Sequence, residues 1–278
     1  MREQSFWSAP MLRWAAAAIV VFNGFFPAIW ILFTSLKTEA ELVQKPITWW
    51  PEHPMLDNYV RAFIDQPLLH YLKNSVIVAT GATGLSLLVA AFAAYAIARL
   101  NLKRRQLILT CIVASSMFPL VTLLVPIFET MRALGWLNSY MALILPYVVL
   151  NLPVCTLVLV SFFQSIPRDL ENAAMIDGCT RLGALWRVVV PLAAPGVFTA
   201  GILAFVNAWD EFLLALSLNS SPAARTLPVG IALYQGEFTF PWPIISAALI
   251  VAIVPVAILI AIFQERVVGG LTQGGLKG

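Results

Sequence analysis

The residue types best suited to chemistry gather in a polar segment, residues 166–191, which separates two long apolar runs. Pro167 fits the first turn of a helix, where its missing N–H removes no hydrogen bond. Asp169 and Glu171 follow at positions where carboxylates interact favourably with the helix dipole. Gly178 is typical of the left-handed residue that ends a helix. Together these residues predict a short helix between Pro167 and Gly178.

A second short helix is predicted directly after the first. It is expected to run from Arg181 to Val190 and to be stopped by Pro191, which cannot continue a helix. The small residues Ala173 and Ala174 in the first helix would let another protein approach closely. The alternative is a plain amphipathic connector that binds nothing.

A second polar group, Asp210 and Glu211, lies within an otherwise apolar run. Ionisable groups inside membrane helices usually face a cavity or a partner. Asn207 precedes Glu211 by four residues and would share its face in a continuous helix. These three residues are candidates for a solute path or gate. The alternative is that the acidic pair marks the outer edge of the membrane.

The motifs of common catalytic and metal sites are missing. The sequence has no G-x-x-x-x-G-K-[ST], no H-E-x-x-H and no G-x-S-x-G. His53 and His70 lie in one polar stretch, and the three cysteines are too far apart for a zinc site or a disulfide framework. We therefore expect no catalytic residues, no metal ligands and no enzymatic activity.

The composition indicates what kind of scaffold carries these residues. Apolar residues make up 60% of the 278 residues and charged residues 11%, whereas soluble domains are about 45–50% apolar and about 25% charged. So few charges cannot cover a water-exposed surface, and so much apolar area cannot stay solvated as a disordered chain. The composition therefore predicts an integral membrane protein.

Six runs are long and apolar enough to cross a bilayer as helices. The first is too long and too rich in bulky aromatics for a cleaved signal peptide, so we expect it to be retained. The predicted fold is an all-α, polytopic membrane protein with a single transmembrane domain over residues 1–278 and a short helical segment between the fourth and fifth spans. The predicted spans are about residues 14–36, 72–98, 107–128, 140–163, 192–218 and 242–263.

The basic residues predict the orientation of these spans. Arg99, Lys103, Arg104 and Arg105 form the densest basic cluster, after the second run, and cytoplasmic loops carry an excess of Lys and Arg. Both termini and the 166–191 segment are therefore expected in the cytoplasm, with the loop from Lys37 to Tyr71 outside. The net charge of +3 is thus interpreted as a topology signal and not as a nucleic-acid patch.

The 166–191 segment reads Asn172-Ala173-Ala174, then Gly178 and, after nine residues, Val188-x-Val190-Pro191. This pattern resembles the E-A-A-x-x-x-G-x9-I-x-L-P loop of ABC-importer permeases, in particular the carbohydrate-uptake type. Other stretches that match the family, in order along the chain, are Ser35–Lys37, Asp57–Tyr59, Asn74–Ser75, Ala94–Leu100, Leu134–Tyr140, Leu143–Tyr147, Ala208–Phe212 and Gly270–Gly278.

The resemblance implies a permease subunit that forms half of the pore of an ATP-driven sugar importer, with a di- or oligosaccharide as its cargo. The sequence is similar to the smaller membrane subunit of the maltose transporter and to trehalose and glycerol-phosphate importer permeases. The implied partners are a second permease subunit, two ATP-binding subunits and an extracytoplasmic sugar-binding protein, all at a bacterial inner membrane. This chain would bind no cofactor, because ATP and Mg would be held by the partner ATPase.

The resemblance also implies which residues couple to the ATPase. They are Glu171, Asn172, Ala173, Ala174, Asp177 and Gly178. Asn172 departs from the family, which has Glu there, so a specific ion pair from this position to the ATPase is not expected. If a sugar touches this chain, Asn207, Asp210 and Glu211 would offer hydrogen bonds. The alternatives are an ABC permease for another small solute and, beyond that, a secondary transporter.

Overall fold

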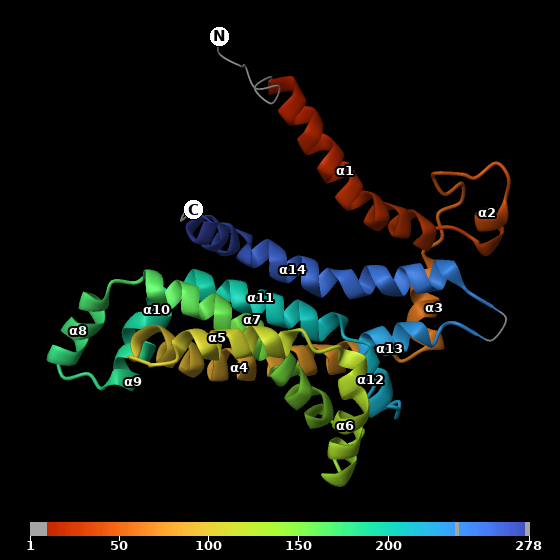
Figure 1. The fold of residues 1–278 in the computed structure, drawn as a ribbon. Helices are drawn as coiled ribbons and strands as arrows, with labels where there is room; N and C mark the ends of the chain where they lie inside the picture. Colours follow the sequence, from red (N-terminus) through yellow and green to blue (C-terminus); the bar gives the residue numbers. More distant parts are fainter. Residues whose placement is uncertain (1–9, 237–238, 276–278) are drawn as a thin grey trace. The chain divides into compact units, whose positions relative to one another are not determined.

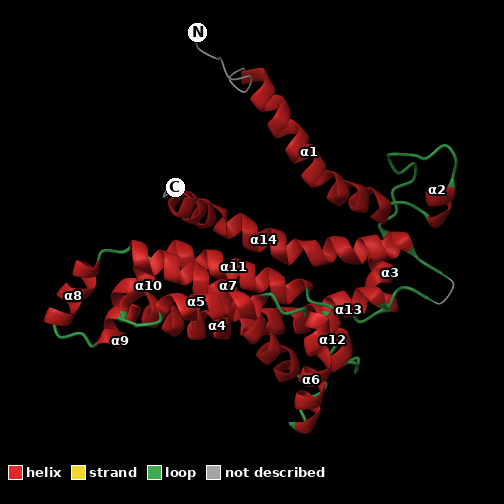
Figure 2. Ribbon diagram, viewed as in Figure 1, coloured by secondary structure: helices red, strands yellow, loops and turns green. Residues whose placement is uncertain are grey.

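The computed structural model describes residues 10–236 and 239–275. Over these residues the secondary structure is helical and contains no strand (Figure 2). The chain divides into two compact units, and each is described by itself. Unit 1 comprises the described parts of residues 1–68 and 231–254, and unit 2 those of residues 69–230 and 255–278. The expected all-α class is confirmed.

Unit 1 contains one long apolar helix followed by short helices. They are α1 (Pro10–Ser35), α2 (Glu39–Val43) and α3 (Asp57–Asp65), and the first half of α14 (Trp242–Gly275) belongs to the same unit. Thr38 and Glu41 form a capping box at the start of α2. The Glu41 carboxylate also accepts the backbone N–H of Glu52 at 2.8 Å, which ties the loop after α2 back to the helix.

Unit 2 contains the remaining helices (Figure 1). They are α4 (Leu68–Arg99), α5 (Arg105–Ser116), α6 (Leu120–Ala133), α7 (Tyr140–Ser165), α8 (Arg168–Ile176), α9 (Arg181–Ala184), a π-helical turn (Leu185–Val189), α10 (Val190–Leu192), α11 (Ala194–Asp210), α12 (Leu213–Leu218), α13 (Leu227–Ala232) and the second half of α14.

The core of unit 2 depends on small side chains in α4. Ala90, Ala94 and Ala98 are buried against α7 and α11, where Cys155 and Ala200 are also fully buried. Small residues let membrane helices approach closely where larger ones would hold them apart. The free thiol of Cys155 donates to the carbonyl of Ala200 and packs as an apolar filler.

Four helices are long and apolar enough to cross a membrane by themselves: residues 13–35, 68–99, 140–165 and 242–263. They agree with four of the six predicted spans. Two further pairs pass the same test only together, and each pair is sharply bent, by 89° between α5 and α6 and by 82° between the α9–α10 segment and α11. Four to six crossings are therefore compatible with the helices, and the count of six stays a prediction.

The third predicted span, residues 107–128, is wrong as a continuous helix. The chain breaks at Met117–Pro119, and α6 then continues to Ala133. Pro119 takes an extended conformation at the start of α6. A proline has no N–H to donate within a helix and disfavours helical geometry in the residue before it. Average hydropathy does not detect such a break.

The fifth predicted span, residues 192–218, is also wrong as a single helix. Helix α11 ends at Asp210, and Glu211 is extended before α12 begins at Leu213. The Glu211 carboxylate accepts the backbone N–H groups of Leu214 at 2.8 Å and Ala215 at 3.1 Å. A side chain that binds these otherwise unpaired donors favours a new helix start.

The predicted stop at Pro191 is wrong too. The helix continues through Pro191 to Leu192, with the π-helical turn immediately before it. Proline at an early helical position removes a donor that would be unpaired anyway, and π turns accommodate irregular hydrogen bonding within helices. The predicted family signature at 270–278 extends beyond the described residues at 276–278, and Arg2 of the predicted basic N-terminus also lies outside them.

Candidate functional site

Helix α8 is bounded by the two residues that the sequence singles out. Pro167 occupies the position before its first turn, and Gly178 follows its end with a φ of +93°. The N–H of Gly178 donates to the carbonyl of Met175 at 3.1 Å, and the N–H of Cys179 donates to that of Ala174 at 2.9 Å. This pair of bonds is a Schellman motif, which needs a left-handed residue and favours glycine there.

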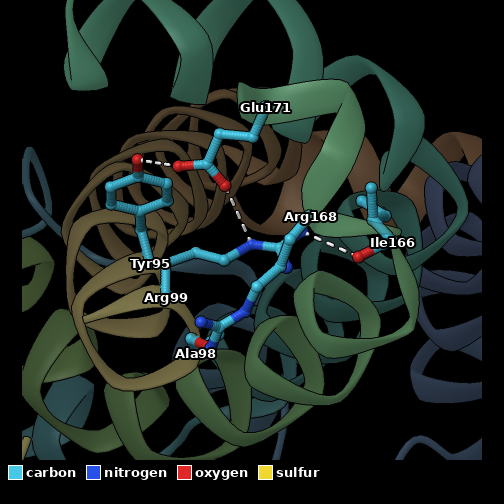
Figure 3. Close-up of polar contacts among 6 residues, drawn as sticks. All are labelled: Tyr95, Ala98, Arg99, Ile166, Arg168 and Glu171. Carbon is cyan, nitrogen blue, oxygen red and sulfur yellow. Dashed lines mark hydrogen bonds and ion pairs between the residues drawn. The ribbon is translucent and has the colours of Figure 1, made fainter. Parts of the chain in front are cut away.

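Glu171 turns away from solvent and holds α8 against the end of α4 (Figure 3). Its Oε2 lies 3.1 Å from Nε of Arg99, and its Oε1 accepts the hydroxyl of Tyr95. The side chains of Arg99 and Glu171 are only 5% and 9% exposed. Because both carboxylate oxygens are engaged within unit 2, this side chain is part of the attachment of α8.

Two further bonds cross the same junction in opposite directions (Figure 3). Nη2 of Arg99 donates to the carbonyl of Ile166 at 3.0 Å, and Nη2 of Arg168 donates to that of Ala98 at 3.4 Å. The last turns of α4 and α7 leave carbonyls without intrahelical partners, and the arginines satisfy one at each helix end. Charged side chains therefore join α8 to the ends of α4 and α7.

The other predicted coupling residues are accessible on α8 or directly after its end. Asn172, Ala173, Asp177 and Gly178 are exposed, and Ala174 is half-buried. Ile176, the last residue of α8, is 86% exposed. The structure thus separates Glu171, whose side chain is buried, from the other five predicted residues, which stay accessible on α8 and in the turn after it.

The three predicted solute-path residues lie around the end of α11 but do not form one row. Asn207 and Asp210 are exposed on α11. Glu211 lies past the helix end, so the expected i,i+4 relation with Asn207 does not hold. Its Oε2 accepts the hydroxyl of Tyr147 at 2.6 Å in addition to the α12 backbone donors.

A buried amide connects this region to α7. The Nδ2 of Asn207 donates to Oδ1 of Asn151 at 3.3 Å, and Asn151 in turn donates to the carbonyl of Ala204 at 3.3 Å. Asn151 is 2% exposed. The hydrogen bond to Asn151 in α7 thus fixes the side chain of Asn207, which stays accessible to solvent.

Sequence reasoning missed the partners of both glutamates. Tyr95 and Arg99 hold Glu171, Arg168 binds the carbonyl of Ala98 beside them, and Tyr147 holds Glu211. The position of Arg99 could have indicated a buried acceptor, because an arginine at the end of an apolar run needs either an acceptor or solvent. Tyr147 offered none, since a tyrosine in a membrane helix is equally consistent with an interfacial position. Within the described residues, no group of three or more His, Cys, Asp or Glu side chains could hold a metal ion.

Comparison with protein families gives a match over most of the chain. The family model described as "Binding-protein-dependent transport system inner membrane component" matches residues 86–273. This range includes α8 with its surroundings and the end of α11.

Curated relatives match over nearly their full length. The sulfoquinovosyl glycerol transport system permease protein SmoH of Agrobacterium fabrum is 74% identical over 274 residues, which cover 99% of this chain and 96% of the relative. The trehalose/maltose transport system permease protein MalG of Thermococcus litoralis is 40% identical, with 91% of each chain covered. The trehalose permease protein SugB of Mycobacterium tuberculosis is 39% identical, with 95% of this chain and 97% of the relative covered.

Solved structures share the fold. A bacterial ABC transporter that imports the acidic polysaccharide alginate superposes with a TM-score of 0.79 at 21% identity, covering 95% of this chain and 98% of that one. A second alginate transporter structure, in complex with its pentasaccharide-bound periplasmic protein, gives a TM-score of 0.64 at 15% identity, covering 95% and 99%.

Proposed function

This chain belongs to the family of binding-protein-dependent transport system inner membrane components, and we propose that its transporter imports an anionic sugar glycoside of the sulfoquinovosyl glycerol class. It is an inner-membrane permease of a carbohydrate-uptake ABC importer and not an enzyme. The single observation that carries the proposed cargo is 74% identity to a sulfoquinovosyl glycerol permease over almost the whole chain.

Charge on the helices around the predicted solute path favours a second candidate cargo. Helices α7 and α11 contain no lysine or arginine, while α11 ends in the exposed carboxylate of Asp210. A sulfonate is repelled by a nearby carboxylate. A neutral disaccharide would instead accept hydrogen bonds from Asn207 and donate to Asp210. If the cargo is a sulfonate, its counter-charge must come from another subunit or from elsewhere in this chain.

Uptake measurements separate the two cargo classes. The complete transporter, reconstituted with its binding protein and ATPase, is expected to accumulate labelled sulfoquinovosyl glycerol in preference to trehalose and maltose. Asp210→Asn should raise the uptake of the anionic cargo if Asp210 faces it, whereas Asp57→Asn, at an exposed aspartate in α3, is the matched control. Preferential uptake of a neutral disaccharide would overturn the proposed cargo and leave the permease assignment unaffected.

For the coupling step, we propose that the outer side of α8 enters a cleft of the ATPase. Asn172, Ala173, Ala174, Asp177 and Gly178 would form the contact, and Glu171 would hold α8 rigidly to α4. Coupling requires an element that both partners bias between two arrangements. A helix held by an ion pair at its base and carrying small residues on its outer side meets that requirement.

The topology, stoichiometry and cofactor follow from the same proposal. Both termini and α8 would lie in the cytoplasm, where two ATPase subunits bind ATP and Mg. A second, different permease subunit would complete the pore. Consistent with such a partner, the candidate span at residues 13–35 has no buried residue in its most apolar stretch.

A bulky residue on α8 tests the coupling proposal. Ala173→Leu should weaken co-purification of the ATPase and reduce transport-coupled ATP hydrolysis, because the added side chain prevents close approach. Ala133→Leu, at an exposed alanine in α6, is the matched control and should leave both unchanged. Unaltered ATPase binding in the Ala173→Leu protein would place the contact elsewhere.

A further inference from the structure

A polar cavity lies beneath α8, on the same side as its attachment to α4. Its volume is about 500 Å³. The lining residues come from the ends of α4, α8 and α9 and from the loop after α4: Tyr95, Arg99, Leu100, Asn101, Arg168, Glu171, Asn172, Met175 and Arg181. Three of these are arginines, and only one is acidic.

The single carboxylate does not neutralise this cavity. Glu171 is engaged through one oxygen by Arg99 and through the other by Tyr95. Arg168 uses one nitrogen for the carbonyl of Ala98, at 3.4 Å, and a guanidinium has five N–H donors. Among the described residues, none forms a hydrogen bond or an ion pair with the exposed side chain of Arg181. Two guanidinium groups therefore lack an acidic partner.

The origin of these two groups matters for what they can bind. Arg168 is the first residue of α8, and Arg181 is the first residue of α9. Figure 3 shows Arg168 beside Arg99, with Arg99 between it and Glu171. The amides of Asn101 and Asn172 add neutral donors to the same wall. Planar guanidinium forks joined by amide donors are the usual means of binding a phosphate group.

We propose that this cavity binds a phosphate-bearing anion through Arg168 and Arg181. Two sources supply that chemistry: the headgroup of an anionic phospholipid and a soluble phosphate ester. Basic pockets at the ends of membrane helices are suited to anionic headgroups on the cytoplasmic side. A bound phosphate would join α8 to α9 and to the end of α4, and so reduce the freedom of α8 to move. Binding depends on this chain alone, whereas its effect on coupling rests on the role proposed above for α8.

Binding is tested on the full-length chain purified in a neutral detergent, at constant ionic strength set with KCl. The unfolding midpoint is measured against inorganic phosphate, against glycerol 1-phosphate, and against phosphatidylglycerol or phosphatidylcholine in mixed micelles. A phosphate-dependent rise is expected, because a ligand that binds only the folded state stabilises it. A rise with phosphatidylglycerol alone identifies a lipid site, and a rise with glycerol 1-phosphate identifies a soluble ester.

Single substitutions test whether Arg168 and Arg181 are responsible for the phosphate-dependent rise in the unfolding midpoint. Arg181→Gln and Arg168→Gln should each weaken the apparent affinity about tenfold, since a charge-assisted hydrogen bond contributes roughly that much. Arg187→Gln is the matched control, because Arg187 is exposed in the same segment but does not line the cavity. No phosphate-dependent rise, or an equal loss in all three variants, would overturn the proposal. Neither result depends on transport, so the proposed function stands or fails separately.

Discussion

Helices α8 and α12 lie near opposite ends of unit 2 (Figure 1). Glu171 in α8 and Glu211, just before α12, are held by different kinds of partner. Each accepts a tyrosine hydroxyl, from Tyr95 and Tyr147 respectively. The remaining partner of Glu171 is the buried guanidinium of Arg99, whereas Glu211 accepts only neutral backbone donors at the start of α12.

This difference shows how the same residue type serves two structural purposes. At α8, the charge of the glutamate is needed, because without it Arg99 is buried without a counter-ion. At α12, the geometry of the acceptor is needed, because the partners are neutral donors, one hydroxyl and two N–H groups, and none of them leaves a buried charge behind. We therefore expect loss of charge to be severe at Glu171 and mild at Glu211.

The largest effect is expected from Glu171→Gln. Removing one member of a buried ion pair typically costs about 3–5 kcal/mol, since the other charge stays buried and uncompensated. The free energy of unfolding, measured in mixed micelles, should fall by that order. Combining Glu171→Gln with Arg99→Gln should recover part of the loss. A double variant no more stable than the single one would show that the ion pair is not the origin of the effect.

The two tyrosines give a matched pair of smaller effects. Tyr95→Phe and Tyr147→Phe each remove one hydroxyl that donates to a carboxylate, and both residues are buried. A hydrogen bond to a charged group contributes about 1.5–3 kcal/mol. Both variants should lose stability in that range, but only Tyr95→Phe should alter the coupling of ATP hydrolysis to transport. If Tyr147→Phe altered coupling as much as Tyr95→Phe, the Glu171 and Glu211 sites would not have separate roles.

Glu211→Gln should cost less than Glu171→Gln, about 1–2 kcal/mol, because the amide keeps one oxygen acceptor while the NH2 group that replaces the other oxygen cannot accept. Glu211→Ala is the comparison, since it leaves the donors of Leu214 and Ala215 without an acceptor. Thermal unfolding of the two variants side by side measures the difference. If Gln is as harmful as Ala, the charge of Glu211 matters and the proposed contrast with Glu171 fails.

A third glutamate extends the comparison through pH. Glu41 in unit 1 also has neutral donors, and its backbone bond with Thr38 holds its pKa below the ordinary value of 4.5. A carboxyl group with a lowered pKa contributes stability above its ordinary pKa and loses it as the pH falls further. The Glu41 carboxylate accepts the N–H groups of Thr38 and Glu52, so the exchange protection of these two amides, corrected for intrinsic exchange, should fall below about pH 4.5. In Glu41→Gln, this pH dependence should disappear.

Much of this architecture is readable from the amino-acid sequence. Hydropathy places the four long helices, because apolar runs must satisfy their backbone groups internally in a bilayer. Local chemistry places α8, since Pro167 and Gly178 act on the backbone within a turn or two. The ordered motifs also indicate the family, which the comparisons confirm.

Contacts between residues far apart in the chain decide the rest. The bond of Glu171 to Arg99 spans 72 positions that no local pattern connects, and the burial that makes it strong exists only after α4, α7 and α8 have packed. The break at Glu211 likewise involves a distant partner, the hydroxyl of Tyr147, whereas the break at Pro119 follows from the proline itself. Apolar length sets which segments become helices, whereas the tertiary structure sets which buried charges find a partner, because Coulomb and hydrogen-bond energies depend on distances in space.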